Sequence, residues 1–182
     1  NHHTKSKLYA DGRDITFTIT KVIRFRGMTF SAVARCKDTG MMGVVVTSSS
    51  PAVAARCAFA QAGVGAVSTQ NITDPSLGPR ALKLIYANAD ALEAIETLQH
   101  SAPDMEYRQI LLIDKNGDTA CHTGSGALGL WAENAGKNVA AAGNLLGDAS
   151  VPRTLVAKFE ESENTSTHLA DRLLDVIKAG LD

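Results

Sequence analysis

Hydrophobic positions along this chain follow the period of strands in some segments and of helices in others. Apolar residues at alternate positions of segment 15–25 are typical of a strand, and Gly27 marks a break after them. The apolar runs 30–34 and 41–46 flank turn-forming residues 36–40, which predicts a β-hairpin. The second run carries no charged residue, so we expect that strand to be buried on both faces.

Downstream of this hairpin, strands and helices are expected in separate blocks. Further strands are expected at 63–69, 107–113, 118–123 and 139–142, and helices at 74–87, 90–99, 151–161 and 167–179. Asp74 before Pro75 is the expected N-cap of the first helix. The order of strands, helices, strands and helices favours an α+β fold over a doubly wound α/β sheet.

Length and composition restrict the classes of function. The 182 residues suit one domain, and a formal net charge of -1 gives no general attraction to nucleic acid. We therefore expect no nucleic-acid partner, and a small neutral substrate or a protein partner fits better. No apolar run reaches about 18 residues, so membrane insertion is not expected.

Three isolated cysteines, Cys36, Cys57 and Cys121, show neither a disulfide pattern nor the spacing of zinc ligands. We expect reduced thiols, a cytoplasmic location, no metal and no cofactor. A thiol enzyme that uses Cys57 or Cys121 with His122 is a weaker hypothesis, because no activating pair can be located from the sequence.

Thr29, directly after Met28, is the residue with the most specific chemistry. If Met28 were the start and were removed, Thr29 would carry a free α-amine beside its hydroxyl, which is a recognised way to activate a weak nucleophile. As the sequence stands, 27 residues precede Met28, and an acylated nitrogen could not act as that base. The alternative is an ordinary threonine at the start of a strand.

Several short motifs occur in an order that points to one family. They are MTFS (28–31), AR (34–35), SSSPAV (48–53), ARCA (55–58), AGVGAV (62–67), TQN (69–71), LGPR (77–80) and AGNLL (142–146). Together they resemble the family known as domain of unknown function 1028, over about 28–182. The resemblance implies an N-terminal-nucleophile (Ntn) hydrolase-like fold, in which two antiparallel sheets lie between helical layers.

The same resemblance divides the chain into residues 1–27 and a domain at 28–182. Similar proteins generally begin at the position of Met28, so 1–27 is interpreted as a tag, a misplaced gene start or a propeptide, and its strand pattern could also pair with a sheet edge. Similar proteins also tend to continue beyond the last helix. For the domain's C-terminal end we leave three alternatives open: a segment that is missing, disordered or supplied by another chain.

Our leading hypothesis is a hydrolase that acts on a small linear or cyclic amide through Thr29. Asn144 and Asn71 are candidates for stabilising the oxyanion, because an amide at a strand end can direct an N–H donor at it. Arg56 could lower the pKa of the α-amine or bind a substrate carboxylate. The other candidates to line the substrate pocket are Ser48, Ser49, Gln70 and Asp74.

The competing hypothesis is a non-catalytic binding or scaffold protein that keeps the fold while its threonine is blocked, since a fold alone does not establish an activity. In either case we expect a homodimer, because sheet sandwiches with small surface residues often bury one face in a symmetric pair.

Overall fold

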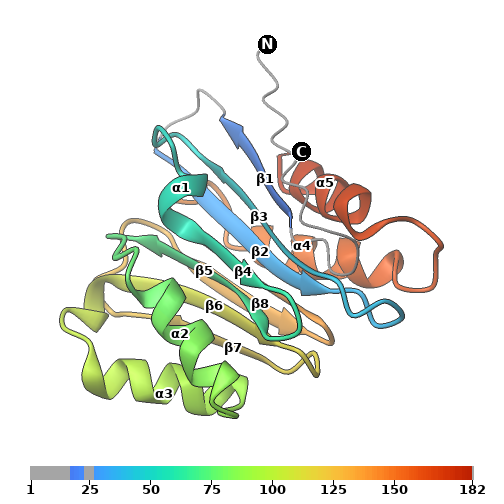
Figure 1. Cartoon of the computed structure of the whole chain (residues 1–182). Helices are drawn as coiled ribbons and strands as arrows, with labels where there is room; N and C mark the ends of the chain where they lie inside the picture. Colours follow the sequence, from blue (N-terminus) through green and yellow to red (C-terminus); the bar gives the residue numbers. More distant parts are fainter. Residues whose placement is uncertain (1–16, 23–26, 182) are drawn as a thin grey trace.

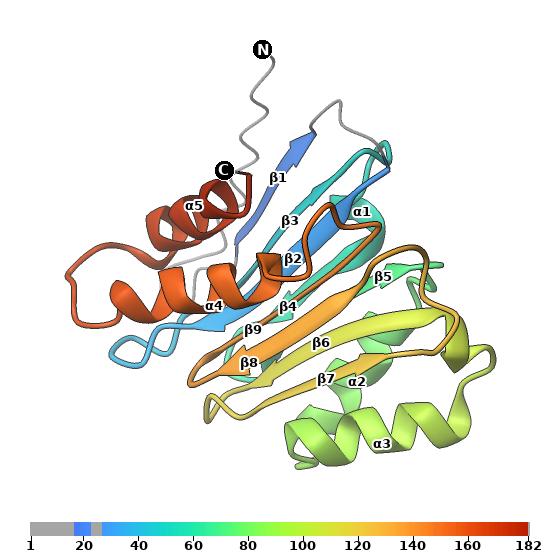
Figure 2. The same ribbon diagram turned by 180° about the vertical axis from the view of Figure 1, so that it is seen from behind.

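Two β-sheets lie face to face, and a pair of helices covers the outer face of each sheet (Figures 1 and 2). This computed structural model describes the backbone of residues 17–22 and residues 27–181. The first sheet has the strand order β1 (Phe17–Val22), β3 (Met42–Ser48), β2 (Thr29–Arg35), β9 (Val139–Asn144) and β8 (Ala132–Gly136). The second has the order β4 (Ala58–Gln61), β5 (Gly65–Asn71), β6 (Arg108–Asp114) and β7 (Thr119–Thr123).

The helices form the two outer layers. Helices α4 (Val151–Glu161) and α5 (Leu169–Ala179) pack on the first sheet, whereas α2 (Leu77–Tyr86) and α3 (Ala91–Ser101) pack on the second. The short helix α1 (Ala54–Cys57) precedes β4, and the 3₁₀ turn η1 (Met105–Tyr107) precedes β6. The expectation of an α+β fold is therefore confirmed.

Strand β1 is the main difference from the two antiparallel sheets that the resemblance implied. It pairs in parallel with β3, from Phe17 opposite Gly43 to Val22 opposite Ser48, whereas the other described strand pairs are antiparallel. The strand expected in 15–25 is thus present at Phe17–Val22, and the remaining positions of that pattern lie outside the described residues. As an edge strand, β1 covers backbone groups of β3.

Each sheet buries one face against its helices and the other against the second sheet. Phe30 on β2 packs with Phe159 of α4 in the first outer core. Leu98 of α3 packs with Leu112 of β6 in the second. A third, smaller cluster fills the space between the sheets. Strands with two buried faces require the near-continuous apolar runs seen in the sequence.

Helix starts depend on local hydrogen bonds. Asp90 and Glu93 form a capping box at the start of α3, in which Asp90 Oδ1 accepts from the Glu93 N–H at 2.9 Å. The predicted N-cap at Asp74 is wrong: α2 begins at Leu77, and Asp74 Oδ1 instead accepts from the Ser76 N–H at 2.9 Å in the preceding turn. The Asp74 carboxylate binds the nearest free backbone N–H, that of Ser76, which lies two residues later and precedes the start of α2.

Two leucines of α3 provide a matched test of the second outer core. Leu98 is fully buried and Leu92 is 59% exposed. We expect Leu98→Ala to lower the free energy of unfolding by about 2–5 kcal/mol, and Leu92→Ala to change it by less than about 1 kcal/mol. Urea denaturation followed by circular dichroism measures both. Equal losses in the two variants would contradict this packing.

Candidate functional site

The surface between the two sheets is apolar over most of its length and polar at one end. Its apolar part includes Val33, Val44, Leu111 and Ala140. Because side chains alternate along a strand, the same face continues into polar residues where β2 begins and β9 ends. These are Thr29, Ser31, Ser48, Ser68, Gln70, Gln109, Thr123 and Asn144. We call this group the polar end of the sandwich.

Thr29 occupies the first position of β2 and lies between the last residues of two neighbouring strands. It is opposite Ser48 on β3 and opposite Asn144 on β9. The Thr29 hydroxyl oxygen lies 2.7 Å from the Ser48 hydroxyl oxygen, which also accepts from the Ser50 N–H at 3.0 Å. The register thus brings Thr29, Ser48 and Asn144, three of the residues selected from the sequence, to one point.

The Thr29 nitrogen is part of the peptide bond to Met28 in this chain. The Met28 carbonyl accepts from the backbone N–H of exposed Ser49 at 3.2 Å, which extends the β2–β3 pairing by one residue. An amide nitrogen has no basic lone pair, so Thr29 has no general base of its own while Met28 remains attached.

Three buried side-chain amides connect the sheets at the polar end. Gln70 Nε2 donates to Gln109 Oε1 at 2.7 Å, and Asn144 Nδ2 donates to the same oxygen at 3.1 Å. Gln70 was expected to line the substrate pocket, but it is only 1% exposed and its amide is used inside the sandwich. Gln109 was missed, although a glutamine within the apolar run of a buried strand is unusual enough to mark a polar contact.

Hydroxyl groups extend these contacts to both sides. The Ser31 hydroxyl bonds Gln70 Oε1 at 2.8 Å and lies 2.9 Å from the Ser68 hydroxyl oxygen. On the other side Thr123 Oγ1 accepts from Gln109 Nε2 at 3.0 Å and donates to Glu133 Oε2 at 2.6 Å. Buried amides in a sandwich are stable only when bonded in this way.

Asn71 uses its side chain to fasten a loop. Its Nδ2 donates to the Tyr107 carbonyl at 2.6 Å, and its Oδ1 accepts from the Leu128 N–H at 3.1 Å. Asn71 has a φ of 73°, a left-handed conformation that asparagine tolerates. Its N–H donor is thus directed at a backbone carbonyl, and no hydrogen bond joins it to Thr29 among the described residues.

Arg56 lies in the short helix α1 and Asp74 in the loop after β5, both at this end of the sheets, and both are engaged locally. Exposed Arg56 donates through Nη2 to the Pro51 carbonyl at 3.0 Å. Hydrogen bonds from Ser76 hold the pKa of Asp74 below its usual value. The structure therefore does not bring these two side chains into the hydrogen-bonded group around Thr29.

An apolar surface adjoins the polar end. Leu145, directly after Asn144, has its N–H bonded to the Leu128 carbonyl at 2.9 Å, and the Leu146 N–H bonds the Leu130 carbonyl at 2.8 Å. We define the apolar rim as Ile72, Tyr107, Leu128, Leu130, Trp131 and Leu145, which are 38–47% exposed. Tyr86 and Leu92 are the only other large exposed hydrophobic residues in 27–181. Large exposed hydrophobic residues are therefore concentrated in the apolar rim and are rare on the rest of the described surface.

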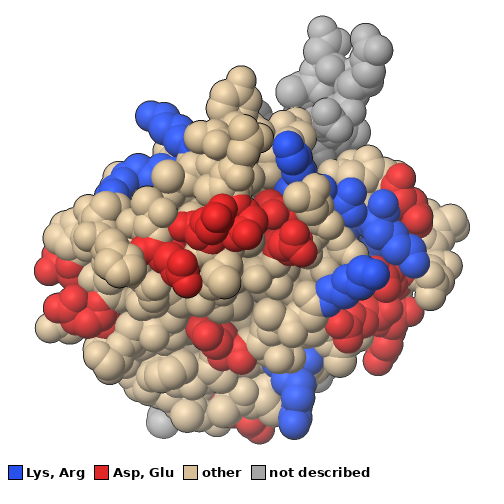
Figure 3. Space-filling model, turned by 90° about the horizontal axis from the view of Figure 1, so that it is seen from below, with Lys and Arg blue, Asp and Glu red and all other residues tan. Residues whose placement is uncertain are grey.

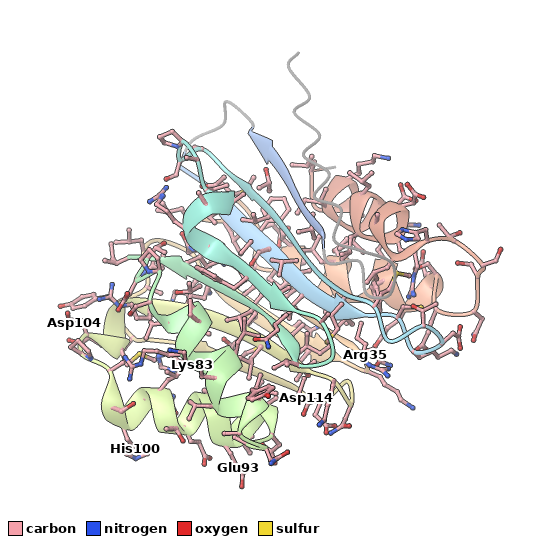
Figure 4. The ribbon with its side chains drawn as sticks, viewed as in Figure 1. Arg35, Lys83, Glu93, His100, Asp104 and Asp114 are labelled. Atoms are coloured by element: carbon pink, nitrogen blue, oxygen red, sulfur yellow. The ribbon has the colours of Figure 1, made fainter. Side chains whose placement is uncertain are left out.

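A shallow hollow of about 260 Å³ lies at the opposite end of the second sheet, between the end of α2 and the turn after β6. Asp114 is part of its lining. Asp104 precedes β6 and Asp114 ends it, and Figure 4 shows them at the two ends of that sheet. Gln109, near the start of β6, bonds the Gly143 carbonyl on the strand that pairs with the strand of Thr29. The hollow lies at the other end of β6, at Asp114, and is therefore remote from Thr29.

Charge and metal binding add little to the site. The face in Figure 3 carries acidic side chains across its middle, with Lys and Arg side chains mainly toward its edges. Across the described part of the chain, no group of His, Cys, Asp and Glu side chains could hold a metal ion. No helix in the same residues is long and apolar enough to cross a membrane.

Among the described residues, no hydrogen bond joins a cysteine thiol to another cysteine or to His122. Burial raises the pKa of Cys121 to about 12, with nearby Glu133 acting in the same direction, and burial also raises the pKa of Cys57. The neighbours Cys121 and His122 point to opposite faces of β7, and His122 bonds Gln99 and the Met105 carbonyl. These contacts and the raised thiol pKa values give no support to the weaker hypothesis of a thiol enzyme that uses Cys57 or Cys121 with His122.

The fold and the site together define an α+β sandwich whose sheets share a hydroxyl- and amide-lined end. The model of a family of unknown function, DUF1028, matches residues 29–182, so the chain belongs to that family. A crystal structure of a DUF1028 protein from Silicibacter pomeroyi is similar, with a TM-score of 0.79 and 23% identity over 85% of this chain and 70% of that one. No curated protein matches this chain.

The raised pKa of Cys121 predicts an unreactive thiol. With a pKa of about 12, only about 10⁻⁴ of this thiol is ionised at pH 8 in the folded protein. We expect iodoacetamide at pH 8 to leave Cys121 unmodified in the folded protein and to alkylate it in urea, as measured by peptide mass spectrometry. Rapid alkylation in the folded protein would contradict the burial.

Proposed function

We propose that this domain, when it begins at Thr29, is an N-terminal-nucleophile amidohydrolase that acts on a small linear or cyclic amide. The observation that carries the proposal is the position of Thr29 at the polar end of the sandwich. Its hydroxyl oxygen is 2.7 Å from that of Ser48, and its strand register places Asn144 beside it. The layered sheets and the resemblance in sequence support an Ntn-hydrolase-like arrangement.

The first step is the attack of Thr29 Oγ1 on the carbonyl carbon of the substrate. The α-amine of Thr29 takes the hydroxyl proton, directly or through a water, as the C–O bond forms. Ser48 cannot be the base, because its hydroxyl is no more basic than that of Thr29, but it can relay the proton. The requirement for a free amine is why the proposal applies to a chain that starts at Thr29.

Negative charge develops on the former carbonyl oxygen and needs a donor. Asn144 Nδ2 has two N–H bonds and gives one to Gln109 Oε1. We assign the other to the oxyanion, with the loss of such a donor expected to lower kcat about 10²- to 10³-fold. Asn71 is the weaker candidate, because its Nδ2 donates to the Tyr107 carbonyl.

The tetrahedral intermediate then collapses to an ester between Thr29 and the acyl group. The C–N bond breaks, and the α-ammonium returns its proton to the leaving amine. Water adds to the ester with the α-amine again as base, which releases the acid and restores the Thr29 hydroxyl. A cyclic amide follows the same steps and leaves its amine attached to the acid.

Loss of Met28 would also free a donor for substrate binding. The Ser49 N–H now bonds the Met28 carbonyl and would lose that acceptor in a chain beginning at Thr29. Arg56, at the same end of the sandwich, could attract a substrate carboxylate or lower the pKa of the α-amine. In this proposal Ser48 contacts the Thr29 hydroxyl, and Gln70 helps to hold the two sheets together. Asp74 stabilises the adjoining loop.

The apolar rim suggests which amides would bind. Leu145 follows Asn144 directly, so a substrate held by Asn144 would have apolar surface next to its carbonyl. Burying a hydrocarbon or aromatic group there is favourable by about 25 cal/mol per Å². We therefore favour substrates with an apolar acyl or amine group. The cytoplasmic location and the homodimer expected from the sequence stay predictions.

The second candidate is a non-catalytic binding protein. It is favoured by one observation, the peptide bond that blocks the Thr29 nitrogen in this chain. In that case the polar end would serve only to hold the sheets together, and the apolar rim would bind a partner without turnover.

Substitution of Thr29 separates the two candidates. The domain is prepared with Thr29 as its first residue by cleaving a fusion partner, and is screened with linear amides, lactams and acylated amino acids. We expect Thr29→Ala to reduce kcat about 10³-fold or more, since it removes the nucleophile, and Thr29→Ser to retain turnover.

The melting temperature of each variant is the control for folding. Mass spectrometry of the natively expressed protein identifies its first residue. Full activity in a chain that keeps residues before Thr29 would rule out the free-amine mechanism. Absence of turnover in the wild-type domain would favour the binding protein, whereas unchanged turnover in Thr29→Ala would show that Thr29 is not the nucleophile and would contradict the proposal.

The apolar rim predicts a chain-length preference. Among acyl anilides from acetyl to octanoyl we expect kcat/KM to rise with chain length, and Leu128→Ser with Trp131→Ser to reduce that gain about tenfold or more. Leu92→Ser is the matched control, because Leu92 is 59% exposed on α3, outside the rim. A preference for acetyl over octanoyl anilide would contradict this role of the rim.

A further inference from the structure

We propose that Gln109, on the sheet that faces Thr29, is a positioning residue that fixes the side-chain amide of Asn144. The inference rests on the proposed function, because it concerns the donor assigned there to the oxyanion. It adds Gln109, which is not part of any of the sequence motifs that identified the other candidate residues. Gln109 is fully buried on β6, across the sandwich from β9.

The orientation of the Gln109 amide follows from counting protons. Gln109 Nε2 lies 3.1 Å from the Gly143 carbonyl oxygen, which can only accept. It also lies 3.0 Å from Thr123 Oγ1, whose single proton is given to the Glu133 carboxylate at 2.6 Å. Both neighbours thus require a donor, so the NH₂ group of Gln109 must face them.

The oxygen of Gln109 is consequently turned toward Asn144. Gln109 Oε1 lies 3.1 Å from Asn144 Nδ2 and 2.7 Å from Gln70 Nε2. If the Asn144 amide were rotated by half a turn, two carbonyl oxygens would face each other at hydrogen-bond distance, which is repulsive. Gln109 therefore selects the rotamer in which Asn144 presents its N–H bonds, and it occupies one of them.

Burial makes this selection strong. Gln109, Gln70 and Asn144 are 0%, 1% and 3% exposed, so water cannot easily replace a lost partner. The two glutamines are opposite each other on β5 and β6, and they donate to successive carbonyls of β9, at Ala142 and Gly143. The end of β9 that carries Asn144 is thereby held from the opposite sheet.

Gln109→Met tests the role, since methionine has a similar shape and neither donates nor accepts strongly. In the domain beginning at Thr29 we expect kcat to fall about 10- to 100-fold with KM within about threefold, as for a misplaced oxyanion donor. In an Asn144→Ala background the same substitution should cause no further loss, because Gln109 acts through Asn144. The matched control is Thr69→Val, a fully buried polar residue of β5 outside the polar end, whose kcat should stay within about threefold of wild type.

A spectroscopic arm does not require turnover. In ¹H–¹⁵N spectra of the wild-type domain we expect the two protons on Asn144 Nδ2 to give well-separated resonances, with nuclear Overhauser contacts to Gln109. Gln109→Met should bring them together and speed their exchange with water, whereas Thr69→Val should leave them in place. The wild-type contacts can be measured even if Gln109→Met does not fold.

The outcomes separate this inference from the proposed function. If no amide is hydrolysed by the wild-type domain, the proposed function fails, while the spectra still test whether Gln109 orients Asn144. If Asn144 shows no contact to Gln109, if its resonances are unchanged in Gln109→Met, or if kcat falls equally in the Asn144→Ala background, the inference is overturned.

Discussion

Buried polar side chains between two sheets impose the main constraint on this structure, because each must find a hydrogen-bond partner inside the sandwich. Ser31 on the first sheet reaches Gln70 on the second, and Gln109 on the second reaches Gly143 and Asn144 on the first. Within 27–181, the buried side-chain atoms without a partner belong to Arg35, Thr69 and Arg108, none of which is in the polar end. These cross-sheet bonds fix the strand ends that carry Thr29 and Asn144.

The outline of the fold follows from local patterns in the sequence. Helix α4 occupies the expected 151–161, and α3 begins at the capping box of Asp90. Strands β4 and β8 were missed for a physical reason. Ala58–Gln61 lies in a run of small residues without a strand period, and Ala132–Gly136 contains only small, charged and amide residues. Both are stabilised by backbone pairing with β5 and β9 rather than by their own composition.

The site was only partly predictable. Thr29, Ser48 and Asn144 were identified from motifs, and the register of β2 brings them together. Asn71 and Arg56 have the appropriate chemical groups, but their amide and guanidinium donate to backbone carbonyls. Gln109 is distant in sequence from Asn144 and lies on the other sheet, so only the packing of the two sheets could reveal their contact.

The central claim is that Thr29 becomes a nucleophile when its amine is free. Labelling with a β-lactone, an electrophile that forms an ester with an activated hydroxyl, followed by intact mass measurement and peptide mapping, tests it most directly. We predict one adduct per chain on Thr29 in the domain that begins there, and none on Thr29 when Met28 is retained. Equal labelling of both forms, or an adduct only on a cysteine, would contradict the claim.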